Sequence, residues 1–411
     1  MNQNKNIFIA ASLANGASIS MILPLLAPLI RELNMQEWQG GALISIGALF
    51  MVIAAVIIAK QHDRFSIYQL LSFGFVGMTI TWGLFTCLLS YGMSIHVSMI
   101  TLFIILIFVR ALSGIFMAMP QIALQTFVMM SFKDEQSRSQ TMSKFGALNS
   151  LGLVLGPLLT TVLLSWGMLT PLWVSFSIFI VITLFILLKF DRQSNYIELT
   201  IKSKDINQST QTKLKIDSEL SFSFSSSLLW FVLGFVIYIA IVTVNLTSGF
   251  YIQDQFKVTP HQSAVYFSQC SLIVGITLVL MQTAISKFFH WSVQRLLWIG
   301  LFMMLLGLIV TLLAQEIWLF QAAYIFYGLA IACLLPAFTT GAAQSAPQYL
   351  QAKIASLCTA TQALSFVIGP ILSTFLYHWH KTMPYVLLVL LMLILMCCFM
   401  FKNKINLSAA V

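Results

Sequence analysis

Residues 151–166 (LGLVLGPLLTTVLLSW) return as residues 364–379 (LSFVIGPILSTFLYHW), at a constant offset of 213 positions. Eight of the sixteen aligned positions are identical, and the shared residues include the central Gly-Pro pair and the terminal tryptophan. Chance matching of apolar residues accounts for shared leucines and valines more easily than for Gly-Pro and Trp in one register. A repeat spaced by about half of a chain indicates two similar halves.

The composition places this chain in a lipid bilayer. Of its 411 residues, 59% are hydrophobic and 8% are charged, and the mean hydropathy is +0.93. Soluble domains carry about 25% charged residues. In lipid the backbone must satisfy its own hydrogen bonds, so we expect each apolar segment to be a helix. The predicted fold is an all-α membrane protein with 12 transmembrane helices in two pseudo-symmetric six-helix bundles.

Apolar segments of spanning length set the domain organisation. We predict an N-terminal six-helix bundle at 1–190, a polar cytoplasmic linker at 191–226 and a C-terminal six-helix bundle at 227–411. The linker contains KSKDINQSTQTKLKIDSELS and little that could form a core. The predicted spans are 6–30, 39–59, 69–91, 97–127, 141–165, 170–190, 227–251, 262–286, 294–314, 317–345, 353–377 and 382–401.

The basic residues predict the orientation. With the N-terminus inside, 17 of the 21 lysines and arginines fall in inside segments. Such an excess marks the cytoplasmic side, so we expect a multi-pass protein of the bacterial inner membrane with both termini cytoplasmic. Because the net charge of +9 lies mostly in alternate loops, it does not form a nucleic-acid-binding patch.

The titratable residues do not form a pattern that predicts enzymatic chemistry. The six cysteines lie in or beside apolar spans without ligand spacing, so we expect no metal and no disulfides. We expect no cofactor, because no phosphate-binding GxxxxGK[ST] loop occurs. No paired acids, histidine cluster or nucleophile–base set falls within the spans, so the chain is not expected to be an enzyme.

Three motifs resemble the major facilitator superfamily, and the resemblance covers the whole chain. Gly152 to Pro157 is similar to the fifth-helix motif of the drug:proton antiporter branch, although Thr160 and Thr161 stand where further glycine is usual. Arg110-Ala-Leu-Ser-Gly114 resembles the fourth-helix motif. The segment 60–64 (KQHDR) resembles the loop between helices two and three, with a thin basic cluster.

The resemblance implies alternating access, in which two bundles rock about a site near the middle of the membrane. It implies that Asp63 and Arg64 stabilise a cytoplasmic gate. Glycines spaced by four let helices approach closely. We therefore expect the duplicated Gly-Pro segments to form the contact between the halves. The predicted gate and interface residues are Asp63, Arg64, Gly114, Gly152, Gly156, Pro157, Gly369 and Pro370.

Arg110 is the charged residue that we place deep within a span. A lone intramembrane charge is costly and is a functional candidate. It could bind an anionic substrate, tune a proton relay or bond to backbone carbonyls. Amide and phenol groups near many Met and Phe residues suit an amphipathic ligand. The predicted substrate-binding residues are Arg110, Asn15, Gln121, Gln125, Asn149, Tyr238, Asn245, Gln269, Tyr324 and Gln362, with Tyr327 as a further cavity candidate.

The acidic residues all lie in loops or at span ends, so the residue that would carry a coupling proton is not identified. Glu32, Asp63 and Asp254 are candidates at the edges, and a titratable substrate is another. We expect a secondary active transporter that exports small amphipathic molecules such as drugs, coupled to protons and working as a monomer. The alternative is an exporter of an anionic metabolite, such as a carboxylate siderophore, motivated by Arg110.

Overall fold

The computed structural model is helical throughout most of its described residues, which are 2–60, 65–94, 98–131, 151–152, 155–190, 225–289, 291–345 and 351–408. Eleven of its helical segments are long and apolar enough to cross a membrane. The predicted fifth span lies partly outside the described residues, and its longer described part belongs to a shorter apolar helix, Leu155–Trp166. The predicted all-α fold is confirmed.

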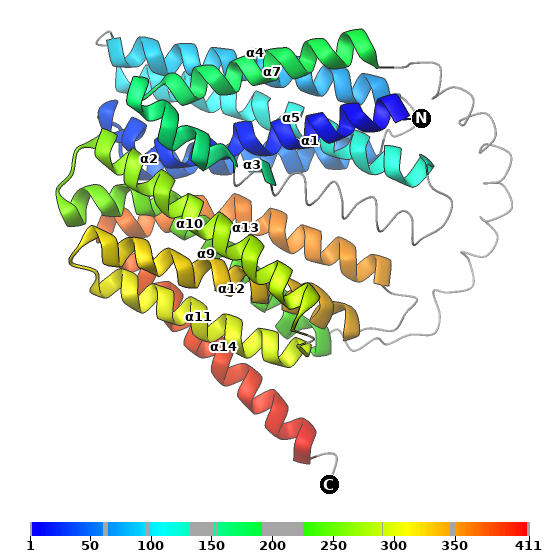
Figure 1. The fold of residues 1–411 in the computed structure, drawn as a ribbon, viewed down its shortest axis with the longest axis vertical. Helices are drawn as coiled ribbons and strands as arrows, with labels where there is room; N and C mark the ends of the chain where they lie inside the picture. The colour runs from blue at the N-terminus through cyan, green and yellow to red at the C-terminus, as the bar shows by residue number, and fades with distance from the viewer. Residues whose placement is uncertain are drawn as a thin grey trace, which may run out of the picture.

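Two groups of helices lie side by side (Figure 1). The first half contains α1 (Asn2–Ser20), α2 (Leu23–Glu32), α3 (Glu37–Lys60), α4 (Ile67–Ser94), α5 (Met99–Ser131), η2 (Leu164–Trp166) and α7 (Thr170–Lys189). The second half contains α9 (Ser225–Phe256), α10 (Pro260–Lys287), α11 (Val293–Leu313), α12 (Ile317–Gln344), α13 (Gln351–Trp379) and α14 (Met383–Ser408).

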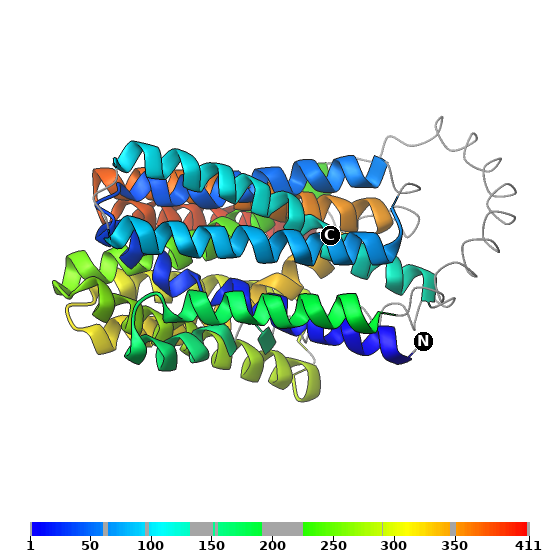
Figure 2. The ribbon, with the colours of Figure 1, turned by 90° about the horizontal axis from the view of Figure 1, so that it is seen from above.

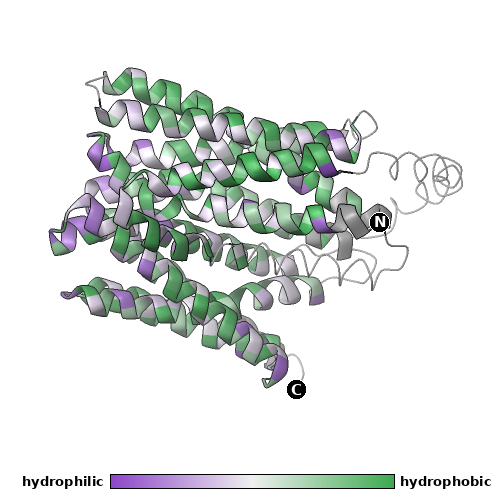
Figure 3. Cartoon of the chain, turned by 45° about the horizontal axis from the view of Figure 1, so that its top comes forward, coloured by the Kyte–Doolittle hydropathy of each residue, from purple (hydrophilic) through white to green (hydrophobic). Residues whose placement is uncertain are grey.

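Side chains divide according to their surroundings. Hydrophilic residues gather towards the ends of the helices, and a mainly hydrophobic band separates them (Figure 3). Many large apolar side chains on the outer faces are exposed, among them Phe108, Leu188 and Leu393. Lipid tails cover such a surface at no cost, so the exposed apolar band is what a bilayer requires.

The first predicted span is broken, a feature that the sequence did not predict. Helix α1 ends at Ser20 and α2 begins at Leu23. Pro24 lies in the first turn of α2, where its missing N–H is tolerated. The Thr160 hydroxyl donates to the Met21 carbonyl at 3.2 Å, and the Ser175 hydroxyl reaches the Ser18 carbonyl at 3.4 Å. Side chains of the same half thus satisfy carbonyls at the break, as lipid demands.

The two copies of the Gly-Pro repeat have equivalent surroundings. Gly152 and Gly156 pack against α1, and an added Cβ at either position would overlap that helix. Gly369 packs against Val242 of α9, the first helix of the second half. These glycines therefore hold each half together internally, and other residues of the same segments contact the other half.

The halves meet through residues that follow the kinks. The Thr161 hydroxyl lies 2.7 Å from the Ser268 hydroxyl of α10. In the second copy, Thr374 packs against Gly41 of α3, where an added Cβ would also overlap the Pro370 carbonyl. Thr161 and Thr374 occupy the same position in the repeat. The duplicated segment therefore serves both purposes, with glycines facing inward and threonines facing the other half.

The main contacts between the halves pair α3 with α13, and α2 with α9 and α10. The contacts of Gly41 with Pro370 and of Arg31 with Asp254 lie where α2 and α13 end and α3 and α10 begin, which we name the closed end. Figure 2 shows the same bundle from above, with the N-terminus at the opposite end from the loop that joins α9 to α10.

Gly41 should be indispensable for this closure. We expect Gly41→Ala to weaken the contact of α3 with α13 and to lower transport at least tenfold, because the new Cβ meets the Pro370 backbone. Gly40→Ala is the matched control, because its Cβ would meet the flexible Ile30 side chain at 3.1 Å. Transport by the two purified variants, with melting curves to confirm folding, tests the difference. Equal activity of the two variants would contradict the predicted role of Gly41.

Candidate functional site: a cavity between the halves

A cavity of about 450 Å³ lies between the two halves. Its wall comes mainly from the second half, and the first half contributes Ser20, Leu23, Ile44 and Pro157. A volume in this range suits a drug-sized ligand. None of the 22 described residues that line it carries a formal charge.

Helices α10 and α12 each present one face to this cavity. Helix α10 contributes positions 271, 274, 275, 278 and 282, and α12 contributes 324, 327, 331 and 335. These steps of three and four residues follow one side of an α-helix. Helix α9 contributes positions from more than one side, which are 238, 240, 241, 242, 244, 245 and 246. The spacing in α10 and α12 is the signal by which sequence reasoning could have found Ser271, Gln282 and their aliphatic lining, which it missed.

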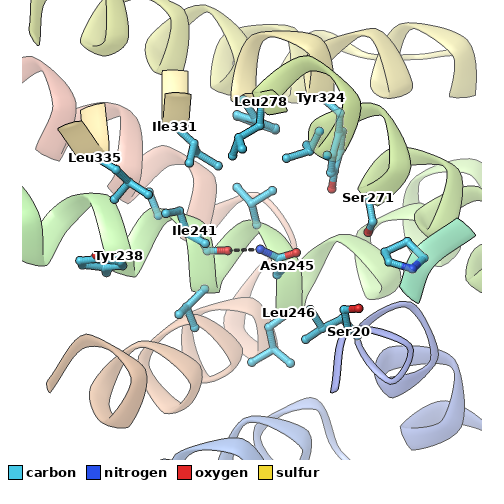
Figure 4. Close-up of a pocket in the computed structure, with 18 of the residues that line it drawn as sticks. Ser20, Tyr238, Ile241, Asn245, Leu246, Ser271, Leu278, Tyr324, Ile331 and Leu335 are labelled. Atoms are coloured by element: carbon cyan, nitrogen blue, oxygen red, sulfur yellow. Dashed lines mark hydrogen bonds between the residues drawn. The ribbon is translucent and has the colours of Figure 1, made fainter. Parts of the chain in front are cut away.

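Four predicted residues line the cavity. They are Tyr238, Asn245 and Tyr324, predicted to bind substrate, and Pro157, predicted at the interface. Tyr327, the further candidate, lines it too. Figure 4 shows the side chains of Tyr238, Asn245 and Tyr324 around the same space.

Other described residues that were predicted to bind substrate do not line this cavity. Asn15, Gln121 and Gln362 are not among the residues that line this cavity. Gln269 accepts a hydrogen bond from the Gln321 amide at 2.7 Å, so it ties α10 to α12. Asn149 and the Gln125 side chain lie outside the described residues, as do Asp63 and Arg64.

Arg110 is not among the described residues that line this cavity. It is packed among helices of the first half. Its Nε lies 3.5 Å from the Leu43 carbonyl of α3, at the limit of a hydrogen bond. Its guanidinium lies 5.5 Å from the centre of the Phe85 ring of α4, in cation–π geometry. Gly47 lies beside the arginine, and an added Cβ at Gly114 would overlap the Gly47 backbone. These surroundings match the alternative in which Arg110 bonds to backbone carbonyls.

A charged cluster joins the halves at the closed end. One guanidinium nitrogen of Arg31, at the end of α2, lies 2.7 Å from Glu37 and 2.9 Å from Asp254 of α9. The Tyr377 hydroxyl of α13 donates to the same Asp254 oxygen at 2.6 Å. His378 lies 3.3 Å from Glu37. The sequence places these residues near the membrane surface but does not connect them.

The cluster is only partly shielded from solvent. The side chains of Arg31 and Asp254 are 31% and 30% exposed, and that of His378 is 46% exposed. Arg31 also lies 5.5 Å from the Phe250 ring, one turn before Asp254 on α9. The cluster can close one end of the space between the halves, and its partly exposed ion pairs can still be broken.

The family model of the Major Facilitator Superfamily matches residues 8–357 and 231–408. No curated protein sequence matches the chain. The nucleoside transporter NupG has a solved structure with a TM-score of 0.71 at 13% identity, covering 98% of this chain and 100% of that one. The D-xylose-proton symporter matches with a TM-score of 0.69 at 14% identity, covering 95% and 96%.

A bacterial homolog of the human lysosomal transporter Spinster also matches, with a TM-score of 0.69 at 12% identity over 97% of this chain and 96% of that one. At these identities the likeness shows the fold. With the family model, which spans nearly the whole sequence, it places this chain in the major facilitator superfamily of membrane transporters.

Proposed function

We propose that this transporter exports uncharged amphipathic small molecules, including antibiotics and other toxic compounds. The uncharged, largely apolar cavity between the halves carries the proposal. Apolar walls with a few hydrogen-bonding groups are suited to such ligands. The outward direction rests on the similarity of Gly152 to Pro157 to the exporter motif.

The same cavity speaks against the anionic alternative. Moving a carboxylate from water into an apolar part of a protein costs several kcal/mol unless a partner compensates. The described wall offers no cation, and Arg110 packs among α3, α4 and α5 instead. A carboxylate siderophore would therefore be poorly bound.

Alternating access assigns the Arg31–Asp254 cluster to a gate. We place the closed end on the outer side of the membrane, in agreement with the distribution of basic residues. In this state the cavity is then accessible from the cytoplasm. To release substrate outside, the protein must separate Arg31 from Asp254 and α3 from α13. The cluster thus stabilises the inward-facing state.

The gate is not the site of proton coupling. An external proton on Asp254 would remove the charge that pairs with Arg31 and so favour opening of the outer end. An exporter driven by incoming protons needs the reverse, because the bound proton must help it return to the inward-facing state. We propose protons as the coupling ion, bound at a different group from Asp254.

The aromatic wall gives a test of the substrate site. Phe366 lines the cavity, with its ring 6.1 Å from that of Tyr238. We expect Phe366→Ala to raise the KM for a neutral amphipathic dye about tenfold in vesicles containing the purified protein. Phe375→Ala is the control, because Phe375 lies on the same helix and packs on Trp379 at its exposed surface. A matching loss in both variants would count against the cavity as the substrate site.

The gate gives a second test. With the native cysteines replaced, spin labels at Glu32→Cys and Lys381→Cys report the separation of the halves at the closed end. We expect Asp254→Asn to shift the population from short towards long distances, because it removes an ion pair between the halves. Glu316→Gln, which changes an acid at the same end outside the cluster, should leave the distances unchanged. If Asp254→Asn keeps the short distance, the cluster is not the gate.

Proton coupling gives a third test. In vesicles with a pH indicator, substrate export by the wild type should move protons inward. We expect Asp254→Asn to alter the rate but to keep the number of protons per substrate, because the gate does not carry the proton. Continued export without proton movement in that variant would assign coupling to Asp254.

A further inference from the structure

The polar groups of the cavity gather towards one side. Figure 4 shows Ser20, Asn245, Ser271 and Tyr324 together, and Ile331 and Leu335 lie on the other side of the space. The positions along the helices agree. In α12, Tyr324 lies nearer the closed end and Leu335 lies about three turns further from it. The cavity is therefore polar towards the closed end and apolar further away, with Tyr238 and Gln282 as polar groups beyond the apolar part.

Most hydroxyl protons at the polar side are already used. Ser20 donates to the Ala17 carbonyl at 3.0 Å, and Ser271 donates to the Phe267 carbonyl at 2.9 Å. Tyr327 is paired with the Thr311 hydroxyl at 2.7 Å. These bonds fasten helices to themselves or to each other, and they leave the groups little to offer as donors to a ligand.

Asn245 is different. Its amide nitrogen donates to the Ile241 carbonyl at 2.8 Å, one turn back in α9. This bond fixes which way the amide points and directs its oxygen away from that carbonyl. The oxygen accepts no hydrogen bond from the described residues, and the side chain is half-buried at the cavity wall. It is a fixed acceptor facing a ligand-sized space.

Tyr324 supplies an unused donor at the same side. Its hydroxyl is buried and has no hydrogen-bond partner among the described residues. Ser248 lies near it, but the Ser248 hydroxyl bonds to the Val244 carbonyl and the Tyr385 hydroxyl instead. A buried polar group without a partner is destabilising, so this hydroxyl is free to donate to a ligand. Small side-chain adjustments are common on binding and would let a ligand oxygen reach it.

We propose that Asn245 is the specificity-determining residue for an uncharged hydroxyl group on an aromatic or polycyclic ligand. The ligand hydroxyl donates to the Asn245 oxygen, and its own oxygen accepts from Tyr324. The hydroxyl end lies towards the closed end, and the apolar body lies along Ile331 and Leu335. This inference rests on the proposed function, since it names the substrate class of the same cavity.

A matched pair of probes tests it. The fluorophores 1-hydroxypyrene and 1-methoxypyrene differ in one hydrogen-bond donor, and both are neutral at pH 6. Binding to the purified full-length protein is followed by energy transfer from tryptophan, corrected with protein-free micelles. We expect the wild type to bind 1-hydroxypyrene about tenfold more tightly, which corresponds to about 1.4 kcal/mol.

The variants separate the role of Asn245 from a general effect on the cavity. Asn245→Leu and Asn245→Ala should bring the ratio of the two affinities close to one. Asn245→Thr should keep part of the preference, because a threonine hydroxyl can donate to Ile241 and still accept from the ligand. Gln282→Leu removes an amide from the other end of the cavity and should keep the full ratio. Tyr324→Phe should reduce the ratio, whereas Tyr327→Phe should not.

The outcomes distinguish the two proposals. If the wild type binds both probes equally, or if Asn245→Leu and Asn245→Ala keep the tenfold ratio, the role of Asn245 is wrong and the proposed function stands. The role of Asn245 is also wrong if Gln282→Leu abolishes the ratio as fully as Asn245→Leu. If the wild type binds neither probe, the proposed substrate class fails, and the role of Asn245 fails with it.

Discussion

The contact of Gly41 with the α13 backbone at Pro370 determines how closely the two halves approach. With no side chain at position 41, α3 can lie directly on the Gly-Pro kink and on Thr374. Without a hydrophobic driving force between helices in lipid, such close packing and hydrogen bonding supply the association. The charged cluster one to two turns away, at the ends of α2, α9 and α13, adds to a contact that the backbones have already made. The cavity is closed at this end because of that approach.

The duplicated segment explains why closure can be reversed without disturbing either half. Gly156 and Gly369 pack on the first helix of their own halves, so they remain packed when the halves separate. Thr161 and Thr374, five residues further along in each copy, face the other half. Within one stretch of sequence, the glycines thus make the internal packing of a half, and the threonines belong to the surface that must separate from the other half. The repeat keeps that division in both copies.

The fold could be predicted well from the sequence because its signals are local. Each apolar span contains its own evidence, and the helix bounds differ from the predicted ones by only a few residues, except where residues are undescribed, at the break after Ser20 and at the end of α14, which continues to Ser408. The break depends on Thr160 and Ser175, which lie more than 130 residues away and become partners only after folding. In the sequence Thr160 is only a departure from a motif, and nothing there assigns it this bond.

The candidate site is less predictable for a similar reason. Tyr238, Asn245 and Tyr324 are polar residues in apolar spans, but Arg110 meets the same criterion and yet packs within the first half. Chemical type does not reveal which side of a helix faces a cavity, so a residue's neighbours at three and four positions are needed as well.

The energetics of the closed end fit a transporter that must open and close repeatedly. Exposed ion pairs contribute about 0.2–1 kcal/mol each, and both partners of the Arg31–Asp254 pair are nearly one-third exposed. A fully buried network would hold the halves together more strongly, because breaking such a pair costs about 3–5 kcal/mol. Because the ion pairs are partly exposed, they define the geometry of the closed state but add little to its stability. Ligand binding in the cavity, worth a few kcal/mol of difference between the two states, is then enough to shift their populations.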